Sequence, residues 1–155
     1  MGRSTVAVAA ALVLAATAHA APAATCDAAG TQRTFRAFVA AFNDGDLARL
    51  DSLFAQPPAF RWYSSSAPGQ RTGAASSTRS TLRPYFRERH RVRDVLAVRS
   101  FHWNGTARGL AHFSFGLRRS ALDHLRGTPF DLVGKGALEC AGGRFVVLSL
   151  GGPKP

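Results

Sequence analysis

The chain has 155 residues, which is enough for one domain and too short for two of ordinary size. Hydrophobic residues make up 46% of it, so a disordered chain is excluded and a packed core is expected. The formal charge of +11 at pH 7 comes almost wholly from arginine, since Lys135 and Lys154 are the only lysines. This charge allows weak attraction to anionic partners, and it also fits the plain effect of G+C-rich coding.

The first 24 residues have the pattern of an export signal. Arg3 supplies a positive charge, an apolar run rich in alanine spans residues 6–16, and Ala18-His19-Ala20 fits the small-x-small cleavage rule. A second such triplet follows at once, so we place cleavage between Ala20 and Ala24. The run is shorter than the ~20 strongly apolar residues of a membrane span. The sequence therefore predicts a signal peptide over 1–24, and a secreted protein with no membrane span after cleavage.

Residues 25–155 are predicted to form one domain, and two cysteines lie near its ends. Cys26 comes just before the first predicted helix, and Cys140 ends a predicted strand near the C-terminus. Cysteines of an exported protein usually pair. A bridge would enclose most of the domain and contribute ~4–5 kcal/mol in the chain-entropy model. The alternative is two separate thiols.

Two short amphipathic helices are predicted at the start of the domain. The first has apolar residues at i, i+3, i+4 and i+7, and the second has a similar stripe. Between them, Gly45 can take the left-handed conformation that ends a helix, and Asp46 can cap the next one. Gln56-Pro57-Pro58 ends the second helix. The stripes are Phe35, Phe38, Val39 and Phe42, then Leu47, Leu50, Leu53 and Phe54.

A short strand, a loop and a third helix are predicted next. Residues 60–63 are aromatic and strand-like, and residues 64–77 are rich in Ser, Gly and Ala, which is typical of a lid or a mobile edge. Ser80 or Thr81 can cap a helix that runs to about His90. Its apolar face carries Leu82, Tyr85, Phe86 and Arg89, and Arg83, Arg87 and Arg91 point outward.

The rest of the chain is predicted as two hairpins. Strands at 95–103 and 110–117 flank Asn104-Gly105, and strands at 130–140 and 144–150 flank Ala141-Gly142-Gly143. A short helical turn is expected at 120–124. Helices followed by antiparallel strands predict an α+β domain, with three N-terminal helices packed on one face of a curved antiparallel sheet.

This layout resembles the nuclear transport factor 2-like superfamily, which includes ketosteroid isomerase, scytalone dehydratase and polyketide cyclases. The resemblance implies a cone with an internal pocket between the helices and the concave sheet, and often a homodimer through the open sheet face. No segment matches any enzyme's catalytic motif, so no catalytic residue is carried over. The resemblance is carried by residues 38–47 with Leu50 and Leu53-Phe54, the strand at 60–63, residues 134–138 and residues 145–150.

Four residues are candidates for binding a ligand in that pocket: Trp62, Tyr85, Arg89 and His112. Trp62 is expected to face inward, with its indole N–H as a polar group. Tyr85 and Arg89 are four apart on one helix face and can together bind an anionic or carbonyl group. The structural alternatives are a core aromatic and a helix C-terminus with favourable positive charge.

His112, Asp131 and Glu139 are weaker candidates for a catalytic base. His112 lies on the strand face opposite Phe113, and the unperturbed pKa of histidine, ~6.5, suits proton transfer. Asp131 and Glu139 share strand parity. A structural histidine and a solvated strand face remain the alternatives.

Other sequence signals exclude several functions. The histidines and cysteines lack metal-ligand spacing, and no phosphate-binding glycine loop or nucleophile elbow occurs, so no cofactor is expected. The basic run at 87–93 lacks the interleaved aromatics of a specific nucleic-acid site. Three hypotheses remain: a non-catalytic protein that binds a small molecule, a cofactor-free isomerase, dehydratase or cyclase, and a module that docks on anionic envelope polymers.

Overall fold

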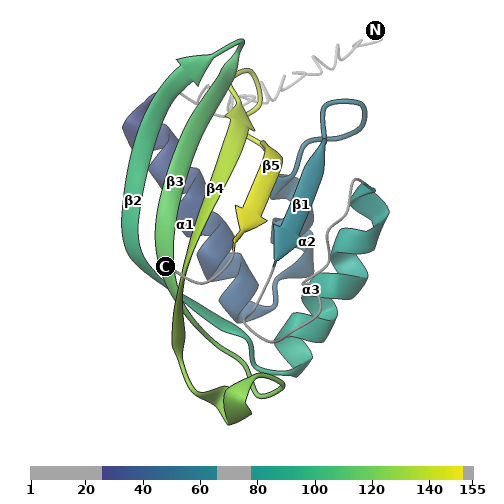
Figure 1. Ribbon diagram of the computed structural model, residues 1–155. Helices are drawn as coiled ribbons and strands as arrows, with labels where there is room; N and C mark the ends of the chain where they lie inside the picture. The colour runs from purple at the N-terminus through teal and green to yellow at the C-terminus, as the bar shows by residue number, and fades with distance from the viewer. Residues whose placement is uncertain (1–25, 66–77, 152–155) are drawn as a thin grey trace, which may run out of the picture.

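The computed structural model describes residues 26–65 and 78–151 (Figure 1). The predicted signal peptide, 1–24, and residues 66–77 of the predicted loop lie outside this described part. In it, helices and a curved, open sheet share a single hydrophobic core. Within the described ranges no helix has the length and hydropathy needed to cross a membrane.

The first two helices confirm the sequence prediction. Helix α1 spans Ala28–Asp44 and α2 spans Leu47–Leu53. The Asp27 carboxylate caps α1 by accepting from the Gly30 N–H, and Asp46 caps α2 by accepting from the Arg49 N–H. Gly45 lies between them in the left-handed conformation, with φ 68°. The predicted stripe residues of α1 are all buried.

Strand β1, Trp62–Ser65, follows α2, and helix α3, Leu82–Arg91, comes after it behind the short 3-10 turn η1, Arg79–Thr81. The strand extends two residues into the segment that we predicted as loop. Thr81 occupies the N-cap position of α3, as predicted, but its hydroxyl donates to the Thr78 carbonyl oxygen and does not cap the helix.

The sheet is mixed rather than purely antiparallel. The strands lie in the order β1-β5-β4-β3-β2, and β1 pairs with β5 in parallel while the other neighbours are antiparallel. β1 lies between α2 and α3 in the chain, where the strand at 60–63 was predicted, so the three helices do not all precede the strands. The other strands are β2 (Val95–Ala107), β3 (Leu110–Ser120), β4 (Phe130–Glu139) and β5 (Phe145–Leu150).

The first hairpin turns later than we predicted. Its turn is Arg108-Gly109, both with positive φ, whereas Asn104-Gly105 lies inside β2. The register of β2 against β3 shifts between Trp103 and Thr106, so Gly105, with φ 90°, occupies a bulge. Glycine is suited both to a hairpin turn and to a bulge. The sequence pattern therefore favoured a turn at Gly105, where the structure has a bulge. The second hairpin turns at the predicted glycines.

The segment between β3 and β4 also differs from the prediction. Ala121 and His124 form an antiparallel bridge where we expected a helical turn, and a short 3-10 turn, η2, falls at Leu125–Gly127.

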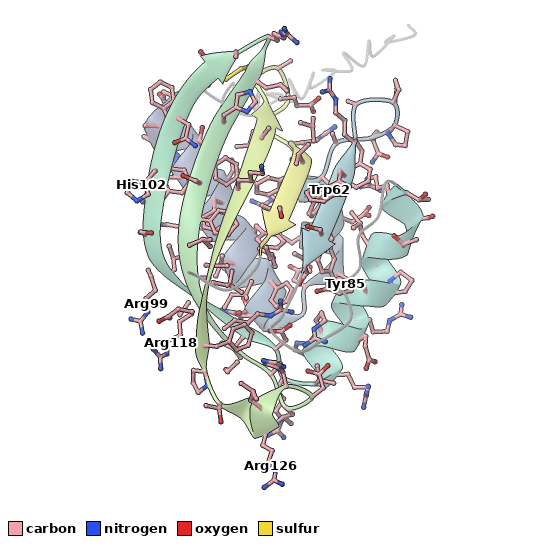
Figure 2. The ribbon with its side chains drawn as sticks, viewed as in Figure 1. Trp62, Tyr85, Arg99, His102, Arg118 and Arg126 are labelled. Atoms are coloured by element: carbon pink, nitrogen blue, oxygen red, sulfur yellow. A yellow bond between two sulfur atoms is a disulfide. The ribbon has the colours of Figure 1, made fainter. Side chains whose placement is uncertain are left out.

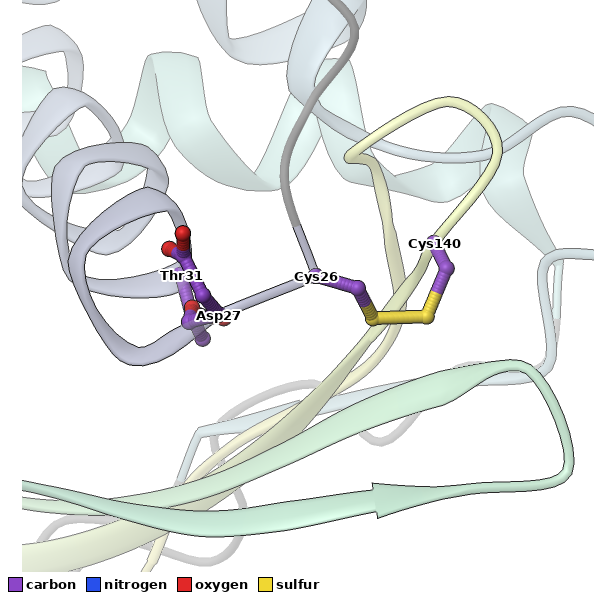
Figure 3. Close-up of a disulfide and its surroundings, with 4 residues drawn as sticks. All are labelled: Cys26, Asp27, Thr31 and Cys140. Atoms are coloured by element: carbon purple, nitrogen blue, oxygen red, sulfur yellow. Dashed lines mark hydrogen bonds between the residues drawn. A yellow bond between two sulfur atoms is a disulfide. The ribbon is translucent and has the colours of Figure 1, made fainter.

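The disulfide between Cys26 and Cys140 confirms the predicted pairing (Figure 3). It joins the start of α1 to the turn between β4 and β5, across 114 residues of sequence. A link over so long a loop restricts the unfolded chain strongly. The bridge therefore fixes α1 against the end of the sheet.

The helices cover one face of the sheet only. Figure 1 shows α1 and α2 behind the strands and α3 beside β1. Side chains on the face toward the helices, called the inner face here, are buried, as Phe113, Phe115 and Leu117 of β3 illustrate. The opposite, outer face is uncovered in the described part. The two faces are the places to look for a site.

Candidate functional site

The inner face is filled by aromatic rings. Phe35 of α1 stacks on Phe115 of β3 with ring centroids 4.3 Å apart, and Phe38 contacts Phe145 of β5 at 5.7 Å. Aromatic and aliphatic side chains thus occupy the middle of the space where the resemblance implies a pocket.

Two glycines of β4 make room for these rings. Gly136 is paired with Phe113 and Gly134 with Phe115 in the register of β3 and β4. A Cβ atom at either glycine would meet the facing phenyl ring. The rings therefore lie across the backbone of β4, which covers the glycines and tightens the core.

A buried network of charges closes the lower end of the inner face, where α3 ends and β2 begins. The Asp94 carboxylate lies between two guanidinium groups: it accepts from Arg89 Nε at 2.6 Å and from Arg119 Nε at 2.9 Å. Arg89 also donates to both oxygens of Asp123, at 2.7 and 2.9 Å. Arg119 donates further to the Ser65 hydroxyl at 2.7 Å.

The environment of this network shifts the pKa values of its two arginines and of the neighbouring Tyr63. Burial lowers the pKa of Arg119, but its hydrogen bonds to Asp94 and the neighbouring charges outweigh burial and raise the pKa above the ordinary value. The same balance, with Asp123 and Asp94 as partners, raises the pKa of Arg89. Burial raises the pKa of Tyr63 well above 10, and Tyr85 adds to the shift.

The network is suited to holding the fold rather than to binding an anion. The donors of Arg89 are directed at two carboxylates, and Arg119 is 2% exposed. Three buried side-chain atoms have no hydrogen-bond partner among the described residues: the Tyr63 hydroxyl, Arg79 Nε and His124 Nε2.

The outer face carries a groove of about 590 Å³ that runs over β2, β3, β4 and β5. At one end it shares Ser100, Gly116 and Val133 with a hollow next to Arg99 and Arg118, and at the other it shares Lys135 with a hollow next to Arg61 and His112. The groove proper is lined by Ser100, His102, Ser114, Phe115, Gly116, Val133, Gly134, Lys135, Ser149 and Gly151.

The alternation of the strands produces this lining. Residues next to an inward phenylalanine point outward, so Ser114 and Gly116 of β3 follow from Phe113 and Phe115. The absence of a side chain at Gly116 leaves the groove floor low, and the hydroxyls of Ser100 and Ser114 border it.

Unpaired positive charge marks the outer face. In the described part of the chain, Lys135, Arg61 and Arg99 form no salt bridge, and Arg118 meets Asp131 only at 3.7 Å. Figure 2 shows Arg99 and Arg118 close together beside the strands, below His102. The groove therefore has an unpaired ammonium group within it and arginines in the adjoining hollows.

The structure does not bring the four predicted ligand-binding residues together. Trp62 is paired with Val147, on the outer side of β1, while Tyr63 is fully buried on the inner side, so the inward placement of Trp62 is wrong. The sequence could not decide which of two adjacent aromatics faced the core. Arg89 faces Asp94 and Asp123, whereas the Tyr85 hydroxyl accepts from Arg119 at 3.5 Å.

The three predicted catalytic candidates lie in three separate hollows. His112 lies next to Lys135, Asp131 next to Arg118, and Glu139 next to the disulfide. His112 and Asp131 are on the outer face, as parity predicts. Among the described residues, no cluster of three or more His, Cys, Asp or Glu side chains has a metal-binding arrangement.

Sequence reasoning missed the centre of the buried network, Asp94 and Arg119. Arg119 continues the alternation of Phe113, Phe115 and Leu117, and this parity was a signal that it faces inward. Asp94 lies between a helix and a strand, and its sequence position resembles an ordinary exposed turn.

Comparison with known proteins identifies the fold. No family model matches the chain, and no curated protein matches it. Among solved structures, the beta subunit of benzoate 1,2-dioxygenase from Burkholderia mallei has 11% identity and a TM-score of 0.63, covering 83% of this chain and 91% of that one. A candidate dehydratase of the nuclear transport factor 2-like family from Streptomyces avermitilis has 15% identity and a TM-score of 0.63, covering 80% and 93%.

A third similar structure, a candidate calcium/calmodulin dependent protein kinase II association domain from Xanthomonas campestris, has 15% identity and a TM-score of 0.62, covering 92% of this chain and 99% of that one. The chain thus has the nuclear transport factor 2-like fold, as the sequence resemblance predicted. Identities this low define the fold alone, and the same fold serves unrelated functions.

Proposed function

We propose that this protein is an exported, non-catalytic binding protein that holds a small molecule with an anionic group and an apolar part in the groove of the outer face. The observation that carries the proposal is the ammonium group of Lys135 within that groove, which forms no salt bridge with any described residue. Residue types and charge in the groove support this ligand class.

Lys135 and the groove hydroxyls suit a carboxylate, sulfonate or phosphate. An ammonium group donates strongly to an anionic oxygen, and serine hydroxyls supply further donors. Ser114 and Ser149 lie on the strands that flank Lys135, and Ser149 is paired directly with it in the sheet. Val133, which is 40% exposed, contributes apolar surface for the rest of the ligand.

Export is part of the proposal. The signal pattern over 1–24 lies outside the described residues, and the disulfide between Cys26 and Cys140 supports an oxidising compartment.

The enzyme hypothesis has less support. A base needs a second group positioned on the same substrate, and His112, Asp131 and Glu139 lie in different hollows. The candidate dehydratase from Streptomyces avermitilis shares the fold only.

A longer anionic polymer is the second candidate ligand, because the groove continues at both ends into hollows with arginines. Eight residue steps along β3, from Leu110 to Arg118, correspond to about 26 Å of surface. A small molecule would depend on Lys135 alone, whereas a polymer would depend on Arg61, Arg99 and Arg118 as well.

The first test is native mass spectrometry of mature protein exported by a bacterial host, followed by titration with anilinonaphthalene sulfonate, a small anion with an apolar body. Lys135→Met should weaken binding of this probe roughly tenfold, or about 1.4 kcal/mol. Arg87→Met, which removes one exposed charge from α3, should leave binding unchanged. Equal binding by wild type and Lys135→Met would contradict the proposal.

A second pair of variants locates the site. Ser100→Trp should block the groove, whereas Thr106→Trp, on the same strand outside the groove, should not. The groove could instead be covered by a second copy of the chain, and analytical ultracentrifugation tests this alternative. If a homodimer covers the groove, the Ser100→Trp variant becomes monomeric and the wild-type protein binds no probe.

A further inference from the structure

The segment between β3 and β4 exposes two leucines at the lower end of the molecule. Leu122 and Leu125 each have 58% of their surface exposed, more than any other large apolar side chain of the described part. Arg126 follows at once, and Figure 2 shows its side chain pointing away from the body of the protein. We call Leu122, Leu125 and Arg126 the leucine tip.

The backbone of the tip is held in an unfavourable conformation. Leu125, Arg126 and Gly127 have φ values of 46°, 53° and 84°, and only the glycine adopts this region at no steric cost. Such strain persists only where the surroundings enforce it, and it clusters at functional segments. Here it directs Leu125 and Arg126 outward.

Contacts on the other side of the segment enforce this conformation. Asp123 is bound by Arg89 of the buried network, and the Leu122 N–H donates to the Val92 carbonyl at 2.9 Å. The His124 ring meets the edge of Phe130 at 4.7 Å between centroids. These contacts hold the backbone of the tip, so Leu122 and Leu125 stay exposed and do not fold back onto an apolar surface.

Two arginines, Arg126 and Arg93, lie close to the leucines. Arg126 forms no salt bridge with the described residues, and neither does Arg93, which follows the Val92 that binds Leu122. The one carboxylate within residues 122–126, that of Asp123, is bound by Arg89. The tip thus combines apolar side chains with unpaired arginines.

We infer that the leucine tip docks on the surface of an anionic lipid bilayer. Leu122 and Leu125 would enter the boundary between headgroups and acyl chains, while Arg126 and Arg93 would bind lipid phosphates. Charge complementarity supports this occupant, and so does the shape: Figure 1 shows η2 at the extreme end of the ribbon, where it can reach a flat surface. A protein partner would need a hollow to receive two projecting leucines.

The test uses mature protein and vesicles of phosphatidylcholine with or without phosphatidylglycerol, at low and physiological salt. The wild-type protein should partition at least tenfold better onto the anionic vesicles. The double variant Leu122→Ser with Leu125→Ser should lose about tenfold of this partitioning, and Arg126→Gln about fivefold. Trp103→Ser, which changes another exposed apolar residue outside both the tip and the groove, is the control and should bind as wild type does.

A fluorescent probe tests insertion directly. Tryptophan emission of Leu125→Trp should shift to the blue on anionic vesicles and be quenched by brominated acyl chains. The two native tryptophans, Trp62 and Trp103, lie away from the tip, so the emission of the wild-type protein should respond little. Full binding of the double serine variant to anionic vesicles would overturn the inference, because binding would then depend on the arginines alone and not on the leucines. Absence of vesicle binding, with or without capture of a protein partner, would overturn it too. Circular dichroism confirms that each variant is folded.

Discussion

The inner and outer faces of the sheet use alternate residues of the same strands for opposite purposes. On β4, Gly134 and Gly136 face inward and receive phenyl rings, whereas Lys135 between them faces outward with no charge partner in the described structure. The inward charge of Asp94 is paired with two arginines, while the outward Lys135, Arg61 and Arg99 form no salt bridge with the described residues. The inner face thus specifies the fold, and the outer face is left available for a ligand.

The largest expected effect comes from breaking the inner charge network. Asp94→Asn removes the charge between two buried guanidinium groups and should lower the free energy of unfolding by about 3–5 kcal/mol. Asp131→Asn, which removes an exposed carboxylate of the outer face, should change it by less than about 0.5 kcal/mol. Urea unfolding at pH 7 measures both. A loss below about 1 kcal/mol for Asp94→Asn would show that the inner charges do not hold the fold.

A glycine on each face gives the next test. Gly136→Ala places a methyl group against the Phe113 ring and should cost about 1–3 kcal/mol through overpacking. The Cβ of Gly116→Ala would meet only the Ser100 hydroxyl, a side chain that can rotate away, so a loss below about 1 kcal/mol is expected. Urea unfolding measures the free energy of unfolding of both variants, provided that its dependence on urea concentration is the same for both. Equal losses would mean that the outer face is packed as tightly as the inner one.

The sequence predicted what depends on local signals. The apolar spacing from Phe35 to Phe42, the left-handed Gly45 and the Asp46 cap all act within a few residues, and each is confirmed. The pairing of Cys26 with Cys140 was predicted for a different reason, because an exported chain with two cysteines has one bridge to form.

The sequence could not predict what depends on register. Asn104-Gly105 and Arg108-Gly109 both suit a turn, and pairing with β3 selects the second. The groove likewise needs β4 and β5 aligned so that Lys135 meets Ser149. The Asp94 and Arg119 contact joins residues 25 apart, from the start of β2 to the end of β3. Strand parity alone marked Arg119 as inward.

A small effect at neutral pH is expected at Tyr63, whose buried hydroxyl has no hydrogen-bond partner in the described structure. Tyr63→Phe should change the free energy of unfolding at pH 7 by less than about 1 kcal/mol, because no hydrogen bond is lost. At alkaline pH the two proteins should diverge. Burial raises the pKa of Tyr63 in the folded protein, so the unfolded chain ionises first, near pH 10, and holds fewer protons than the folded one.

Stability of the wild type should therefore fall as the pH rises above about 10, by up to about 1.4 kcal/mol per pH unit from this group. Tyr63→Phe should fall less steeply over the same range. Since the chain has only two tyrosines, the phenolate absorbance of Tyr85→Phe reports Tyr63 alone. Titration of that absorbance near pH 10 in the folded protein would mean that water reaches Tyr63, and that the inner face is more open than its packed rings indicate.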